Sequence, residues 1–209
     1  MSISKGNMKI GALPSFSLPA LQTCPGKTDF CADICYGLRG NFVFLSVKNI
    51  YKQNQIASTG EGFVDSITNQ IRKTHAEAFR LHVVGDFYCV PYIEKWMEIA
   101  RRLPDVSFFG STRSWRTAGL ANAVGTFRDM PNVYIKASID PSNRDSPDDN
   151  WGVWSIEGKG YPCPHDFGLV ENCKQCGRCW SDQFTDIRFN LRWGRKKRVN
   201  PDQAAMMGG

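Results

Sequence analysis

The chain has 209 residues, 42% of them hydrophobic and 12% aromatic, a composition typical of a folded globular protein rather than a disordered one. Lys and Arg outnumber Asp and Glu by 26 to 20, and the net charge of +6 permits polyanionic partners without requiring them. No apolar run is long enough to span a membrane, and the first residues lack the apolar centre of a secretory signal. We therefore expect a cytoplasmic protein with no membrane partner.

The first chemical feature is a group of three cysteines near the N-terminus, which follows a short extended segment over residues 9–14. Cys24, Cys31 and Cys35 lie within twelve residues, and the i,i+4 spacing of the last two places them on one face of a helical turn. In a reducing compartment such thiols are more often metal ligands than disulfides. They could hold a separate metal, contribute to a site further along the chain, or pack as small apolar side chains.

Helical and strand patterns alternate through the middle of the chain. Hydrophobic spacing predicts helices over residues 41–57 and 62–72. Next come strand, helix, strand, helix and strand patterns, over residues 80–84, 92–103, 106–109, 115–128 and 133–137. This βαβαβ order predicts an α/β fold with a parallel sheet, open or curled into a partial barrel, in a single domain over residues 1–209.

Polar residues follow the predicted strands, where ligands gather in parallel sheets. Asp86 and Arg113 are candidate residues of a small polar pocket, and no catalytic residue is assigned. Asp86 is equally typical of a turn, and Arg113 could pair with Asp86 or Asp140, or hold a phosphate or carboxylate. His82, expected inside the strand, is more typical of a core histidine, and Cys89 of a packed thiol.

A second cysteine group follows a polar, turn-rich connection over residues 141–160. Within residues 163–180, Cys163 precedes Cys173-x-x-Cys176-x-x-Cys179. The Cys-x-x-Cys-x-x-Cys run seats three corners of a [4Fe–4S] cluster in bacterial ferredoxins, whereas structural zinc more often takes two separated pairs. We therefore predict a [4Fe–4S] cluster on these four cysteines, near the C-terminus, with zinc as the alternative cofactor. Disulfides and free thiols remain open, and His165 is an alternative ligand.

The C-terminal segment over residues 186–198 is basic. Apolar and polar residues alternate over 186–193, the period of a half-buried strand, and four consecutive positive charges follow. Such a segment could bind single-stranded RNA or DNA, or be a solvated edge strand and tail. The candidate nucleic-acid contacts are Arg188, Arg192, Arg195, Lys196, Lys197 and Arg198.

Four motifs together resemble a known family. They are Cys24-Pro-Gly…Cys31…Cys35-Tyr, Gly85-Asp86-Phe87…Trp96, Thr112-Arg113-Ser114-Trp115 and Cys173…Cys176-Gly-x-Cys179-Trp. Over residues 20 to 190 the chain resembles the small cysteine-rich phage and plasmid proteins of unassigned function catalogued as gene product eighty-eight. The resemblance implies a viral protein in the host bacterial cytoplasm, a suspected iron–sulfur centre and a distant similarity to radical-enzyme barrels. It implies no catalytic residues.

The N-terminal cysteines also resemble the loop of radical S-adenosylmethionine enzymes, whose cluster leaves one iron open for the cofactor. Their spacing is Cys-x3-Cys-x2-Cys, whereas this chain has Cys-x6-Cys-x3-Cys, a departure that counts against the activity. Our first hypothesis is a [4Fe–4S] protein, structural or redox, with a basic surface for nucleic acid. The alternatives are a divergent radical or redox enzyme with its open-iron cluster on the N-terminal cysteines, and a zinc-stabilised nucleic-acid-binding module.

Overall fold

Seven parallel strands form one sheet in a computed structural model, which describes residues 1–145, 147 and 150–191. The strand order is β1-β2-β3-β4-β5-β7-β6, and every pairing between neighbours is parallel. The strands are β1 Ser15–Phe16, β2 Ala78–Leu81, β3 Ser107–Thr112, β4 Val133–Ile139, β5 Val153–Ile156, β6 Tyr161–Pro162 and β7 Ile187–Phe189. The predicted α/β class and parallel sheet are therefore confirmed.

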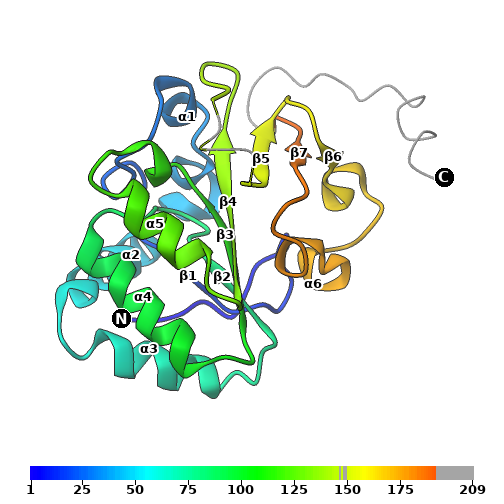
Figure 1. Ribbon diagram of the computed structural model, residues 1–209. Coiled ribbons are helices and arrows are strands. Elements are labelled where there is room, and N and C mark those ends of the chain that lie inside the picture. The colour runs from blue at the N-terminus through cyan, green and yellow to red at the C-terminus, as the bar shows by residue number, and fades with distance from the viewer. Residues whose placement is uncertain (146, 148–149, 192–209) are drawn as a thin grey trace.

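The longer helices connect or flank these strands. They are α2 Leu45–Thr59, α3 Phe63–Arg72, α4 Val90–Arg102 and α5 Ala121–Arg128, with the short α1 Asp29–Asp33 and α6 Cys173–Cys176. The 3-10 turns are η1 Tyr36–Leu38, η2 Gly40–Val43, η3 Ser114–Arg116, η4 Pro164–Phe167 and η5 Arg178–Trp180. Because β2, β3 and β4 are added in one direction, right-handed crossovers place α4 and α5 on the same face of the sheet. Figure 1 shows α3, α4 and α5 on one side of these strands and α6 on the other. No helix in the described ranges is long and apolar enough to cross a bilayer.

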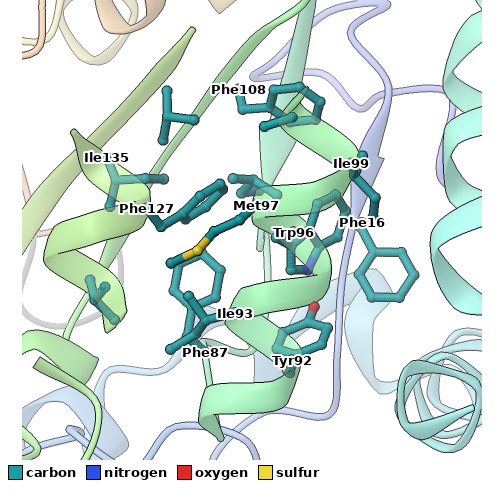
Figure 2. Close-up of a cluster of buried hydrophobic side chains, with 14 of the residues drawn as sticks. Phe16, Phe87, Tyr92, Ile93, Trp96, Met97, Ile99, Phe108, Phe127 and Ile135 are labelled. Atoms are coloured by element: carbon teal, nitrogen blue, oxygen red, sulfur yellow. The ribbon is translucent and has the colours of Figure 1, made fainter. Parts of the chain in front are cut away.

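The helix-covered face of the sheet holds the main apolar core. Trp96 of α4 is fully buried at its centre (Figure 2). Its ring centroid lies 5.6 to 6.3 Å from those of Phe16, Phe63, Phe79 and Phe108. Aromatic side chains from three strands and two helices therefore meet in one cluster, and edge-to-face contacts add to the apolar area that they bury.

The opposite face is covered by loops, and we call it the loop-covered face. Because side chains alternate along a strand, every second residue of β2, β3 and β4 points to this side instead of into the main core. On this side Ala78 and Phe109 of the sheet form an apolar cluster with Ile10 and Leu13 of the N-terminal segment. Three residues of the C-terminal loop pack against the cluster, namely Cys173, Cys179 and Trp180. The rings of Phe109 and Trp180 lie 4.9 Å apart. The cysteine-rich loop is therefore one wall of a small second core.

Several element boundaries differ from those predicted from the sequence. The strand predicted over residues 80–84 is β2 Ala78–Leu81, and His82 lies outside it because its φ of +52° leaves the strand conformation. The helix predicted over 115–128 is divided into η3 and α5, with Leu120 as the N-cap of α5. The predicted half-buried strand over 186–193 is the shorter β7, which pairs with β5 and β6 and so is no edge strand.

One strand lies in the segment that we expected to be a polar connection, and a second strand follows that segment directly. β5 and β6 fall within or just after residues 141–160, and β5 pairs with β4 and β7. Val153 and Ser155 of β5 are buried. Four residues give too short a pattern to separate a strand from a loop, so the prediction was wrong here because tertiary pairing decides the conformation.

Candidate functional site

A buried carboxylate follows β2. Gly85 turns the chain with φ +88°, at a position where a Cβ would stand 2.6 Å from the Leu18 Cβ. Asp86 is 5% exposed and its Oδ1 accepts hydrogen bonds from the Thr112 hydroxyl at 2.6 Å and the Phe87 amide at 2.8 Å. Its Oδ2 accepts one from the Arg113 amide at 2.8 Å. Burial raises the pKa of Asp86, against the effect of these hydrogen bonds. The carboxylate ties two strand ends together.

An ion pair forms at the next two strand ends. The Arg113 Nη1 atom lies 2.8 Å from Asp140 Oδ2, and both side chains are buried. Oδ2 also accepts a hydrogen bond from the Thr28 hydroxyl at 2.6 Å, and Ser142 donates to Oδ1 at 2.6 Å. Burial opposes ionisation of Asp140, but the hydrogen bonds from Ser142 and Thr28 and the Arg113 charge together lower its pKa. Of the roles foreseen for Arg113, the structure contains the pairing with Asp140.

This network holds the N-terminal cysteine loop over the strand ends (Figure 1). The Thr28 hydroxyl accepts a hydrogen bond from the Cys31 amide at 3.0 Å and so caps α1. Gly26 lies against Arg113, the residue after β3, where a Cβ would stand 2.0 Å from the Arg113 carbonyl oxygen. Burial, with smaller contributions from the Cys31 and Cys35 thiols, raises the pKa of Cys24 to about 12, and burial also raises the pKa of Cys31.

The C-terminal loop gathers its four cysteines on the loop-covered face. Asn172 caps α6 by accepting a hydrogen bond from the Gln175 amide at 3.1 Å, and Gly177, with φ +71°, ends the helix. The Cys173 amide donates to the Lys9 carbonyl at 2.7 Å. Electrostatic coupling links Cys173 to Cys163 and Cys176, and links Cys179 to Cys163 and Cys173. Burial raises the pKa of Cys179 to about 12, so an unligated thiol here stays protonated.

Buried cations surround these thiols, and sequence reasoning missed them. The Arg80 guanidinium lies 4.5 Å from the ring centroid of Trp154 and 5.5 Å from that of Phe109. It lies on the same face of the sheet as Cys173 and Cys179, close enough for charges on those thiols to raise its pKa. Within the described ranges no carboxylate lies within 4.0 Å of it. Burial lowers the pKa of Arg80.

Lys136 is the second buried cation and is 0% exposed. Its Nζ donates hydrogen bonds to the Asp182 and Thr185 carbonyls, each at 2.8 Å, and its charge reaches Cys179. Lys9, the third cation, pairs with Asp166 at 3.1 Å and also faces Cys173. The sequence did contain a signal for these two buried cations, because Arg80 and Lys136 are each the only charged residue within a largely apolar strand.

The thiols are gathered but do not form a ligand set for a single ion. Among the residues that the structure describes, no three His, Cys, Asp or Glu side chains are placed so that they could hold a metal ion. The cysteines are free thiols, and His165 Nδ1 lies 3.8 Å from Asp166 Oδ1. The loop is thus where the sequence predicted it, whereas a formed metal site is not found in these residues.

The candidate nucleic-acid residues fall mostly outside the described chain. Arg188 lies in β7, with its guanidinium 5.9 Å from the Phe167 ring centroid. The remaining five candidates, Arg192, Arg195, Lys196, Lys197 and Arg198, lie outside the described residues.

Comparison with known proteins identifies the family. The gene product 88 family matches residues 2–153. The chain belongs to this family. It is 26% identical to the Gene 88 protein of Mycobacterium phage D29, over 83% of this chain and 85% of that protein. It is 28% identical to the Gene 88 protein of Mycobacterium phage L5, over 67% of this chain and 62% of that protein. No solved structure is significantly similar to the chain.

The gene product 88 match confirms the resemblance seen in the sequence motifs, with a different span. The match begins before residue 20 and ends before residue 190. It includes the strand-end network and the N-terminal cysteines, whereas the four C-terminal cysteines lie beyond it.

Proposed function

We propose that this member of the gene product 88 family is a phage iron–sulfur protein that binds a [4Fe–4S] cluster through Cys163, Cys173, Cys176 and Cys179. The observation that carries the proposal is Arg80, a buried guanidinium that faces Cys173 and Cys179 and has no carboxylate within 4.0 Å among the described residues. A buried charge without a counter-charge is costly. A centre ligated by four thiolates is anionic and would offset Arg80 together with Lys136 and Lys9.

The spread of the thiols favours a cluster over zinc. Thiolates around one tetrahedral Zn²⁺, at about 2.3 Å each, stand about 3.8 Å apart, which is the convergence of a single-ion site. No three of the described Cys, His, Asp or Glu side chains converge in this way. A [4Fe–4S] cube takes its ligands at four separate corners and so accepts thiols that are further apart. The Cys-x-x-Cys-x-x-Cys spacing supports the same choice.

The cluster's role would be structural or redox. Four cysteine ligands leave no iron open, so such a centre can exchange electrons or fasten the loop but cannot bind a substrate directly. The loop already covers the second core through Cys173, Cys179 and Trp180. The thiols must lose their protons to bind, so binding should weaken as the pH falls. The reducing cytoplasm of a bacterial host would keep these thiols available.

Metal analysis of anaerobically prepared protein tests the proposal. We expect iron and acid-labile sulfide, with broad absorption near 400 nm, and expect Cys176→Ala to abolish the signal of the C-terminal centre. Cys89→Ala is the matched control, because Cys89 lies outside both cysteine groups and packs against the main core. Zinc without sulfide, or an unchanged centre in Cys176→Ala, would contradict the assignment.

Arg80 has a test of its own. Replacing Arg80 by Met removes a positive charge beside the centre while keeping an unbranched side chain of similar length. The reduction potential should fall, because the charge that favours the more negative reduced cluster is gone. Arg101→Met is the control, since Arg101 is an exposed arginine on α4. Equal potentials in the wild type and both variants would show that Arg80 does not face the cluster.

Nucleic-acid binding is a second candidate function. The basic residues from Arg188 to Arg198 carry it, and β7 anchors the start of this segment between β5 and β6. Single-stranded RNA or DNA would be the partner, bound mainly through its phosphates.

A further inference from the structure

The turn after β3 carries hydrogen-bond donors that lack acceptors in the described residues. The Trp115 Nε1 and Arg116 Nη1 atoms are shielded from solvent and have no hydrogen-bond partner there. Arg113 Nη1 is a third such atom, since its 2.8 Å ion pair with Asp140 lacks the alignment of a hydrogen bond. The other shielded polar atoms of this kind lie in five separate parts of the chain, on Thr68, His82, Trp96, Arg128 and Trp154. A shielded donor without an acceptor is costly, so three such donors in one turn indicate a missing ligand.

The backbone of this turn brings the two arginines to one side. Arg113 is the N-cap of η3, and the Arg116 amide donates a hydrogen bond to the Arg113 carbonyl at 3.1 Å. Residues three apart in a 3-10 turn lie directly above one another, so both side chains start from the same side of η3. The Arg116 guanidinium lies 5.5 Å from the Trp115 ring centroid, and Trp115 packs against the main core. The turn therefore presents two guanidinium groups and an indole N–H from a well-anchored position.

The charge of Arg116 is not offset by the described chain, in which no carboxylate lies within 4.0 Å of its guanidinium. The two carboxylates next to the turn are Asp140, which pairs with Arg113, and Asp86, which accepts a hydrogen bond from the Arg113 amide. Both oxygens of each carboxylate already accept hydrogen bonds from the protein. The positive charge of Arg116 is therefore left for an anion that comes from outside the chain.

We propose that residues 113–116 form a binding site for a small phosphate monoester, with Arg113, Trp115 and Arg116 as hydrogen-bond donors to its phosphate group. Donors on three side chains match the three free oxygens of a monoester, whereas the fork of one guanidinium is enough for a carboxylate. The turn follows the carboxyl end of β3, which is where parallel α/β sheets bind their ligands. Gly26 forms one wall, because it has no side chain and its backbone lies against Arg113. The site is separate from the proposed cluster and adds a ligand class to the function.

Equilibrium dialysis of the full-length protein with radiolabelled inorganic phosphate tests the site. Arg116→Gln should weaken phosphate binding by about tenfold or more, the effect of losing a charge-assisted hydrogen bond. Arg116 has no ion pair and no hydrogen bond from its guanidinium to lose in the described residues, so the melting temperature without phosphate should stay that of the wild type. Arg101→Gln is the matched control, because it removes the same charge from an exposed position on α4 and should bind phosphate like the wild type.

The Trp115 indole shows where the phosphate binds. In protein labelled with nitrogen-15 at tryptophan, inorganic phosphate should move one indole N–H resonance downfield, because a hydrogen bond to an anion deshields the proton. Trp115→Phe keeps an aromatic ring against the core but has no N–H, so the resonance that moves should be the one missing from its spectrum. Sodium chloride at the same ionic strength is the control for general screening and should leave this resonance in place.

The outcomes decide between a phosphate site and general attraction to a basic protein. Saturable binding that Arg116→Gln weakens and Arg101→Gln does not would support the inference. No saturable binding, equal weakening in both arginine variants, or a shift at another tryptophan would overturn it. Acetate that binds as tightly as phosphate at matched ionic strength would overturn the choice of a phosphate group. None of these measurements depends on iron, so failure here leaves the C-terminal cluster standing, and failure of that cluster leaves this site standing.

Discussion

The two faces of the sheet are built by different means. Aromatic and aliphatic side chains of β2, β3, α3, α4 and α5 fill the helix-covered face. The loop-covered face has a smaller apolar cluster and two buried cations. It is covered by a loop that contains four cysteines, not by long helices. Apolar burial alone can hold the first face, whereas Arg80 and Lys136 on the second have no ion-pair partner among the described residues. The anionic centre that we propose for the loop-covered face would offset these two charges.

The largest expected effect is on the helix-covered face. Trp96→Ala removes the ring against which Phe16, Phe63, Phe79 and Phe108 pack, so we expect a loss of about 3–5 kcal/mol in the free energy of unfolding. Trp180→Ala is the comparison on the other face, where the indole is partly exposed and packs on Phe109. Denaturant unfolding of the metal-free protein should show a clearly smaller loss for Trp180→Ala. Equal losses would remove the contrast between the faces.

Removal of the proposed cluster should loosen one face and spare the other. We expect chelation of iron to lower the local opening free energy around residues 163–185 by about 2 kcal/mol or more, because binding and ordering of the loop are coupled. Hydrogen exchange measured by mass spectrometry compares these residues with α3, α4 and α5. The wild type should lose protection only in the loop, and Cys176→Ala should show that state without chelation. Uniform loss of protection would argue for a single cooperative core.

His82 gives the helix-covered face a pH dependence. It is buried, its Nε2 lies 2.8 Å from the Tyr92 hydroxyl, and burial followed by the Arg80 charge lowers its pKa from 6.5 to about 3. Below pH 6.5 the His82 imidazole becomes protonated in the unfolded chain but stays neutral in the folded chain until the pH approaches 3. Stability should therefore fall as the pH falls from 6.5 towards 3, by about 1.4 kcal/mol per pH unit from this group.

His82→Asn should flatten that dependence in urea unfolding measured between pH 4 and 7. Asparagine does not titrate there, and it tolerates the positive φ at this position. His75→Asn is the matched control, because His75 also has a positive φ, of +49°, but is exposed. An unchanged slope in His82→Asn, or the same change in His75→Asn, would show that another group causes the acid sensitivity.

The smallest expected effect concerns the basic segment. Replacing Arg192, Arg195, Lys196, Lys197 and Arg198 by Gln should weaken binding of a single-stranded oligonucleotide and reduce its dependence on salt. Each lost phosphate contact lowers the slope of log K against log salt by about 0.7 for single strands. Fluorescence anisotropy over a salt series measures this slope. The control for loss of net charge replaces five exposed lysines elsewhere by Gln, namely Lys5, Lys27, Lys48, Lys52 and Lys73. An identical binding curve in the basic-segment variant would remove the proposal.

Hydrophobic periodicity and cysteine spacing in the sequence predicted the sheet type and the two cysteine groups. The alternation of strands and helices over residues 80–140 predicted a parallel α/β sheet, because long amphipathic segments keep their own period wherever they pack. Rare residues in a fixed order identified the family. The spacing of the cysteines predicted two separate groups, because residues only a few positions apart in the chain cannot move far from each other.

Tertiary structure alone decided how distant residues meet. The sequence left Arg113 between several roles, and the fold pairs it with Asp140 because the ends of β3 and β4 lie side by side in the sheet. Nothing local assigned a conformation to Val153–Ile156, which becomes a strand by pairing with β4 and β7. Arg80 faces Cys173 and Cys179 only because the C-terminal loop folds back over the sheet. Local spacing sets which groups are available, and long-range packing sets which of them come into contact.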